Sequence, residues 1–161
     1  DLAKRATRTV MLSDGEIIEE YLVSAFPSLT EPQLIRATRH LERKRFQAGS
    51  IVLHEGAPPD RLYIVTKGQI EVQVEAPDGD RMVVARMGRG QYFGEIELLR
   101  GGANIASIRA DLESGVEVAT LDRDTFNGLM SESEPTRKAV EQLAEQRIAE
   151  NVNGRNGENH A

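Results

Sequence analysis

One short segment, residues 91–102, holds the residue types from which a small-molecule site could be built. A β-rich run leads into Gly94, and we expect a short helix to begin at Glu95 or Ile96. Glycine lets a ligand approach the backbone closely, and the first amides of a helix are unpaired and attract anions. The Glu95 carboxylate beside them is suited to accept hydrogen bonds from vicinal hydroxyls. A Gly-Glu pair before a helix is also found in plain turns, so both interpretations stay open.

Catalytic and metal-binding patterns are missing from the rest of the sequence. The absence of cysteine excludes disulfides, thiolate zinc sites and cysteine nucleophiles, and fits a reducing cytoplasm. His40, His54 and His160 have no metal-binding spacing, and no serine elbow or phosphate-binding glycine loop occurs. On the expected helix, Glu95 and Glu97 point to different sides and form no catalytic pair. We therefore expect no enzymatic activity.

Two helices are predicted before residue 42. Ser13-Asp14-Gly15-Glu16 has the form of a capping box, and apolar residues then recur at helical spacing up to Pro27: Ile17, Ile18, Tyr21, Leu22, Ala25 and Phe26. Thr30-Glu31-Pro32-Gln33 has the same form and starts a second helix that runs to Leu41. Residues 1–12 are expected to be a linker or the end of a preceding domain. The triplet Arg43-Lys44-Arg45 is interpreted as the start of a strand rather than as a nucleic-acid patch.

Between Phe46 and Asp122 the pattern changes to short β-rich runs separated by glycines. In the clearest run Ile70, Val72 and Val74 alternate with polar residues, as in a half-buried strand. The other runs are 51–53, 62–66, 82–87, 105–110 and 116–121. Many short strands with frequent turns predict a sandwich, a jelly roll or a barrel.

Helical spacing returns after Asp122, with a short helix around Phe126 and a longer one from Pro135 to Glu150. The longer helix has an apolar stripe, which consists of Ala139, Val140, Leu143, Ala144 and Ile148. Residues 151–161 are nearly all polar, and we expect them to be a disordered tail. One domain over residues 13–150 is therefore predicted.

Composition excludes several kinds of partner. The 161 residues carry a net charge of −6, with 20 Lys and Arg against 26 Asp and Glu, so we expect no nucleic-acid binding through phosphate contacts. The longest apolar stretches, such as Leu62–Val65, are too short to insert into a membrane. No signal peptide is visible. Because the first residue is Asp rather than Met, we expect a piece of a longer protein.

Several motifs together resemble the cyclic nucleotide-binding domain family over about residues 20–150. The segment Phe93-Gly94-Glu95-Ile96-x-Leu98-Leu99-x-Gly101 is similar to the phosphate-binding cassette of that family. Further marks follow the family's order: Ala48-Gly49-x-Ile51-Val52, Glu55-Gly56, Asp60–Val65 with Gly68, Gly88-x-Gly90 and Leu121-Asp122-Arg123-x-x-Phe126. The resemblance implies a mainly β fold with flanking helices, namely an eight-stranded, double-sheet jelly roll with N-terminal and C-terminal helices.

The resemblance also implies a ligand site. In the family, the cassette Gly and Glu meet the sugar, helix amides meet the cyclic phosphate, and an Arg completes the phosphate site. Gly94, Glu95 and Ile96 match this pattern, whereas Asn104 falls at the Arg position and Ile105 replaces a small residue. Neither Arg100 nor Arg109 is a convincing substitute for that Arg. The candidate ligand-binding residues are Gly94, Glu95, Ile96, Leu98, Asn104, Ile105 and Ala106.

The function that this resemblance implies is regulatory. We expect a cytoplasmic signalling domain that binds cAMP or cGMP weakly or in a modified way, with no other cofactor or metal. Its C-terminal helix, residues 135–150, would pass the signal to an effector domain of the same or a partner chain, such as a transporter, a channel or an enzyme. The alternative is a degenerate fold that binds no nucleotide and serves as an interaction or assembly module. A homo-oligomer stays open in both cases.

Overall fold

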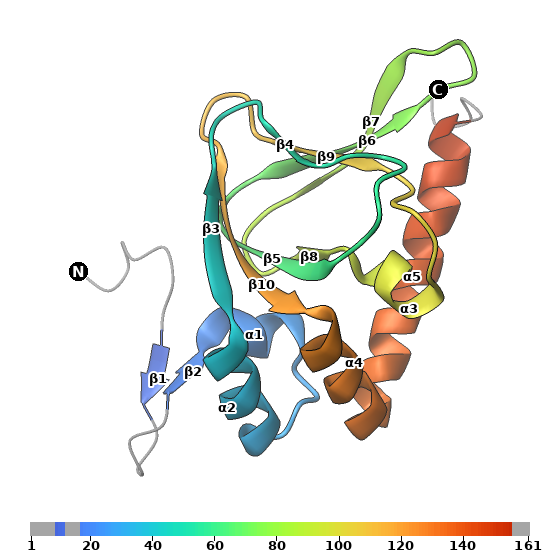
Figure 1. Ribbon diagram of the computed structural model, residues 1–161. Coiled ribbons are helices and arrows are strands. Elements are labelled where there is room, and N and C mark those ends of the chain that lie inside the picture. Colours follow the sequence, from blue (N-terminus) through green and yellow to red (C-terminus); the bar gives the residue numbers. More distant parts are fainter. Residues whose placement is uncertain (1–8, 12–16, 156–161) are drawn as a thin grey trace.

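Two antiparallel four-stranded sheets form the centre of the computed structural model, which describes residues 9–11 and 17–155 (Figure 1). The first sheet has the order β3 (Glu42–Phe46), β10 (Val116–Asp122), β5 (Arg61–Gly68) and β8 (Tyr92–Phe93). The second has the order β4 (Ile51–Leu53), β9 (Ser107–Ala110), β6 (Ile70–Glu75) and β7 (Arg81–Met87). This arrangement confirms the predicted eight-stranded jelly roll.

Strand β5 joins the two apolar cores of the molecule. Successive side chains of a strand point to opposite faces. Leu62 and Ile64 are fully buried in the core shared with the helices, and Tyr63 and Val65 are buried in the core between the sheets. Because both of its faces are covered, β5 reads in the sequence as a continuous apolar run rather than as an alternating one.

Three helices cover the outer face of the first sheet: α1 (Glu20–Ala25), α2 (Glu31–His40) and α4 (Arg123–Glu132). Their buried side chains include Phe26, Leu34 and Phe126. The predicted capping box at α2 is confirmed, since the Gln33 amide donates to Thr30 Oγ1 and the Thr30 amide donates to Gln33 Oε1.

Helix α5 (Glu134–Arg155) leaves this group and runs past the ends of both sheets toward the β6–β7 hairpin (Figure 1). Ser133 alone separates it from α4 and has an extended backbone. The Ser133 hydroxyl donates to Thr136 Oγ1 at 2.7 Å, which fixes the first turn of α5. Short helix α3 (Glu95–Arg100) lies between α5 and the first sheet.

The N-terminal region differs from the prediction. The expected helix begins at Glu20, and Ile17–Glu19 form strand β2 instead, paired antiparallel with β1 (Thr9–Met11). Two β-branched residues suit a strand once a partner strand supplies the backbone hydrogen bonds. Strand β1 also lies inside the stretch that was expected to be a linker. The predicted capping box at 13–16 lies outside the described residues.

The C-terminal end differs as well. The tail expected from residue 151 is helical as far as Arg155, and Asn151 is buried. A helix that is already formed needs only one further hydrogen bond for each residue added, so even polar residues extend it where they find a packing surface. In the part of the chain that the structure describes, no helix has the length and apolar character needed to cross a bilayer.

Candidate functional site

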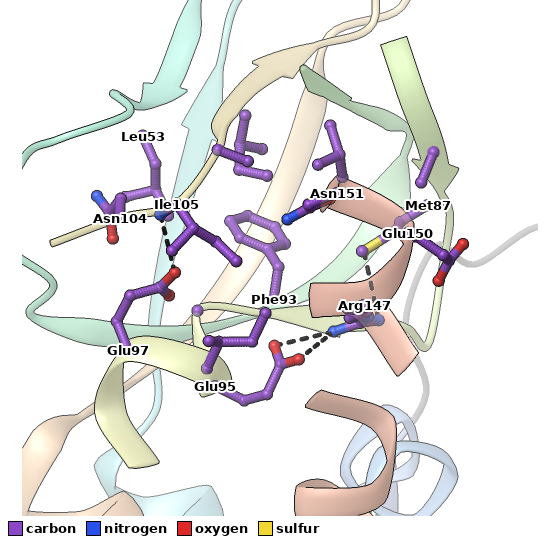
Figure 2. Close-up of a pocket in the computed structure, with 16 residues that line it drawn as sticks. Leu53, Met87, Phe93, Glu95, Glu97, Asn104, Ile105, Arg147, Glu150 and Asn151 are labelled. Carbon is purple, nitrogen blue, oxygen red and sulfur yellow. Dashed lines mark hydrogen bonds and ion pairs between the residues drawn. The ribbon is translucent and has the colours of Figure 1, made fainter. Parts of the chain in front are cut away.

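A cavity lies between the two sheets and is bordered by α3 on one side and α5 on another (Figure 2). Its apolar wall includes Leu53, Val72, Met87, Phe93 and Ile108. Its polar groups are Glu95, Glu97, Asn104, Arg147, Glu150 and Asn151. An apolar cavity with a few convergent polar groups is the ordinary form of a small-molecule site. The described residues contain no group of three side chains that could hold a metal ion.

Gly94 creates the sharp turn from β8 into α3. Its φ of 93° lies in the left-handed region, and an added Cβ would stand 2.7 Å from the carbonyl oxygen of Arg61. Only glycine fits there without strain. The turn directs the next residue, Glu95, into the interior, where 1% of its surface is exposed. The sequence prediction of a strand, a glycine and a short helix beginning at Glu95 or Ile96 is confirmed, and the helix begins at Glu95.

The Glu95 carboxylate is paired with Arg147 of α5. Nη1 of Arg147 donates to both carboxylate oxygens, at 2.9 and 2.8 Å, and to the carbonyl oxygen of Tyr92 at 2.6 Å (Figure 2). The guanidinium also lies over the Tyr92 ring, 5.3 Å from its centroid. One side chain of α5 therefore ties this helix to both β8 and α3.

Burial dominates the electrostatics of this pair. It raises the pKa of Glu95 above its ordinary value, and the charge of Arg147 opposes that rise. Burial and the nearby Glu95 carboxylate raise the pKa of Tyr92 to about 12. Breaking the ion pair would leave a buried carboxylate without its cation, which is costly.

A second carboxylate of α3, Glu97, also lines the cavity (Figure 2). It is 6% exposed, and its Oε2 accepts a hydrogen bond from the backbone amide of Ile105 at 3.1 Å. The Ile105 side chain extends toward Phe93 (Figure 2). Ile96 and Ala106 also line the cavity.

Two of the candidate residues lie differently from what the resemblance implied. The Asn104 amide donates to the carbonyl oxygen of His54 at 3.2 Å and is directed away from Phe93 and Glu95 (Figure 2). It borders the cavity without presenting its donor to the interior. Leu98 belongs to the apolar core beneath the helices and does not line the cavity. The other five candidates line the cavity together.

The two alternative arginines lie outside the cavity. Arg100 is half exposed and faces Glu145 at 3.8 Å on the outside of α5. Arg109 lies on β9 between Ile108 and Ala110, whose side chains fill the core between the sheets. Alternation along the strand therefore puts Arg109 on the outer face, and neither arginine reaches the cavity.

Sequence reasoning missed the residues that α5 contributes: Arg147, Glu150 and Asn151. A signal for two of them was present. Val140, Ala144, Arg147 and Asn151 are spaced as i, i+4, i+7 and i+11, which puts them on one face of a helix. That face is apolar where it covers the core and polar where it reaches the cavity. The prediction that residue 151 begins a disordered tail hid this continuity.

The cavity is narrow in this structure, a state that we call closed. Its free interior volume is about 50 Å³, enough for a few water molecules. A ligand the size of a nucleoside needs a wall to move. Strands β6, β7 and β9 are held by sheet hydrogen bonds. The wall formed by α5 is held mainly by side chains, with Arg147 at its centre.

Comparison with known protein families gives a consistent match. Residues 43–133 match the sequence model described as "Cyclic nucleotide-binding domain". Over 137 residues the chain is 31% identical to a cGMP-dependent protein kinase, isozyme 2, from Drosophila melanogaster, covering 81% of this chain and 15% of the kinase. It is 33% identical over 103 residues to a CRP-like cAMP-activated global transcriptional regulator from Mycobacterium tuberculosis, covering 63% of this chain and 45% of the regulator.

Solved structures agree with the fold. The regulatory domain of Toxoplasma gondii PKA, crystallised with cAMP, superposes with a TM-score of 0.67 and is 29% identical, covering 74% of this chain and 44% of that one. A regulatory subunit of a cAMP-independent protein kinase A from Trypanosoma brucei superposes with a TM-score of 0.71 at 23% identity, covering 78% and 45%. The chain thus spans less than half the length of these relatives.

Proposed function

The chain belongs to the cyclic nucleotide-binding domain family, and from this premise we propose that it is a ligand-sensing regulatory domain whose output is the position of α5. The ligand enters the cavity beside α3. It competes with Arg147 for Glu95 or pushes α5 outward, and an effector elsewhere in the protein responds to the displaced helix. The domain itself performs no catalysis in this proposal.

The observation that carries this proposal is the contact of Arg147 with Glu95 across a closed cavity. A ligand large enough to use the Glu95 carboxylate does not fit into about 50 Å³. Binding and the closed position of α5 therefore exclude one another, and a ligand shifts the population toward a state with α5 displaced. The position of α5 therefore depends on whether a ligand is bound, and this dependence is what a sensing domain requires.

The family favours cAMP or cGMP as the class of ligand. The Drosophila relative is named as a cGMP-dependent kinase, and the Toxoplasma domain was crystallised with cAMP. We propose that either cyclic nucleotide binds weakly here, since Asn104 brings no charge to the phosphate side. A charge-assisted hydrogen bond contributes about 1.5–3 kcal/mol, so its loss lowers affinity roughly ten- to a hundred-fold.

The effector is proposed by analogy. The relatives attach a domain of this kind to a kinase or to a transcriptional regulator. We propose a cytoplasmic transporter, channel or enzyme assembly in which this domain occupies one segment. The net charge of −6 makes direct nucleic-acid binding by this segment unfavourable.

The test measures one distance with and without ligand. The chain has no cysteine, so spin labels can be placed at Lys44→Cys on β3 and Ala149→Cys on α5, both exposed in the closed state. A saturating cyclic nucleotide is expected to change the distribution of distances between the labels. The control pair, Lys44→Cys with Asn127→Cys on α4, is expected to stay unchanged. Ligand binding without any change in the first pair would refute the proposed readout.

A second candidate function is an assembly module without a ligand. It is favoured by the Asn104 amide, which is bonded to His54, and by the Glu97 carboxylate, which takes the Ile105 amide. A thermal-shift titration separates the two functions, since a ligand that binds only the folded state raises the melting temperature in a saturable way. No shift with millimolar ligand would leave the module as the better description.

A further inference from the structure

The side chains that line the cavity carry more negative than positive charges. Among the described residues that line it, three are carboxylates, Glu95, Glu97 and Glu150, and one is a cation, Arg147. The cation already donates to both oxygens of Glu95. An anionic ligand therefore finds no cation that is not already paired with a carboxylate, and it meets two further acidic side chains.

Glu97 lies beside the segment that carries Asn104, the position at which the family has its phosphate-binding Arg. Its carboxylate is 6% exposed and accepts the hydrogen bond of the Ile105 amide at 3.1 Å. That amide belongs to the segment beside Asn104, whose own donor is turned to His54. The Ile105 amide and the Asn104 side-chain donor thus both serve groups of the protein. A phosphate placed here would face a buried negative charge in a region of low dielectric constant, where repulsion is strong.

The remaining groups favour a ligand that donates hydrogen bonds and has an apolar body. A carboxylate such as Glu95 has about four acceptor positions, and Arg147 fills two of them. The Asn151 amide extends from α5 toward the Phe93 ring and offers both a donor and an acceptor (Figure 2). Between them the wall is apolar, with Val72, Met87 and Phe93. Two neighbouring hydroxyls on a body that carries a flat heterocycle match this arrangement.

We infer that the cavity selects an uncharged ribonucleoside over the corresponding 3′,5′-cyclic nucleotide. This inference rests on the proposed sensing role of the same cavity and names its ligand class. The nucleoside places its ribose hydroxyls on Glu95 and its base against Phe93 and Asn151. It brings no negative charge to Glu97. Binding of a cyclic phosphate would add a third negative charge to the site, beside those of Glu95 and Glu97.

The experiment compares adenosine and guanosine with cAMP and cGMP by isothermal titration calorimetry on the intact chain at neutral pH. Because a like charge next to a buried carboxylate is strongly unfavourable, each nucleoside that binds is expected to do so at least about tenfold more tightly than its cyclic nucleotide. Deoxyadenosine, which lacks the 2′-hydroxyl, is expected to bind about tenfold more weakly than adenosine, since one hydrogen bond to a charged group is lost.

A matched pair of variants assigns the selection to Glu97. Glu97→Gln keeps the acceptor for the Ile105 amide and removes the charge, so it is expected to tighten cAMP binding about tenfold and to leave adenosine within about twofold. Glu113→Gln makes the same change of net charge on an exposed turn and is expected to alter neither affinity. Circular dichroism of each variant checks the fold.

The outcomes separate this inference from the function on which it rests. Cyclic nucleotides that bind as tightly as nucleosides, or more tightly, would overturn the inference and leave the sensing role intact. An unchanged preference in Glu97→Gln would overturn the assignment to that carboxylate. Failure of all four compounds to bind would overturn the sensing role and the inference together.

Discussion

Replacing Arg147 by methionine tests the contact on which the proposed function depends. The substitution keeps an unbranched apolar side chain on α5 and removes the guanidinium. Lost with it are the hydrogen bonds to both oxygens of Glu95 and to the Tyr92 carbonyl oxygen. The Glu95 carboxylate, 1% exposed, then remains buried without its cation.

The expected cost follows from this burial. Removing one partner of a buried ion pair lowers the free energy of unfolding by about 3–5 kcal/mol. Protonation of Glu95 reduces this loss of stability. Its pKa is already raised by burial, and it rises further once Arg147 is gone, so the folded variant binds a proton more tightly than the folded parent. The stability difference between parent and Arg147→Met is therefore largest at neutral pH and shrinks as the pH falls through the Glu95 pKa.

Urea unfolding followed by circular dichroism measures this difference. The control is Arg137→Met on the same helix, where the ion pair with Glu141 is exposed and contributes less than about 1 kcal/mol. Glu95→Gln combined with Arg147→Met removes the unpaired charge, so the double variant is expected to be more stable than Arg147→Met alone. A cost of Arg147→Met no greater than that of Arg137→Met, or the same cost at every pH, would refute the reasoning.

Three further predictions concern single positions. Gly94→Ala forces a side chain into a left-handed backbone and against the Arg61 carbonyl, so it is expected to cost at least about 1–2 kcal/mol in urea unfolding; an unchanged midpoint would contradict this. Asp122→Ala removes the cap of α4 and is expected to cost about 1 kcal/mol, whereas Asp122→Asn, which can still cap, should cost less. Asn104→Arg is expected to strengthen cAMP binding about ten- to a hundred-fold. Adding Ile105→Ala should improve it further, and calorimetry that finds neither variant better than the parent would show that the site differs in shape as well as in charge.

The fold was accessible from the sequence because its strongest signals are local. Thr30 and Gln33 cap α2 through groups three residues apart, and Gly94 sits at the turn that only glycine tolerates. Alternation along β6 identified the apolar face that lies in the core between the sheets, but the prediction of a half-buried strand was wrong, since Glu71 and Gln73 on the other face are buried as well. The prediction of helix for Ile17–Glu19 was wrong because the conformation of this segment depends on its pairing with β1. A helical spacing over so few residues does not reveal such a partner.

Only part of the candidate site could be predicted from the sequence, for a related reason. Gly94, Glu95 and Ile96 are consecutive, so one motif identified all three. Arg147 is 52 residues from Glu95, and only the packing of α5 brings the two together. Asn104 lines the cavity, but its side chain donates to the nearby His54 carbonyl oxygen, and this contact is set by loop geometry that spacing in the sequence does not encode.

Only one non-helical residue, Ser133, separates α5 from α4, so a rotation of α5 about Ser133 would displace its far end more than its beginning. With 22 residues the helix is about 33 Å long, and Arg147 lies about 20 Å from its start. A rotation of about 10° at Ser133 moves Arg147 by about 3 Å, enough to separate it from Glu95, and moves the far end by about 6 Å. On the other side of Ser133, α4 is anchored by the buried side chains Phe126, Leu129 and Met130, and Arg36 of α2 pairs with Glu132 at 2.7 Å. In the proposed mechanism, a displacement of Arg147 at the cavity thus corresponds to a displacement about twice as large at the far end of α5, while α4 stays in place.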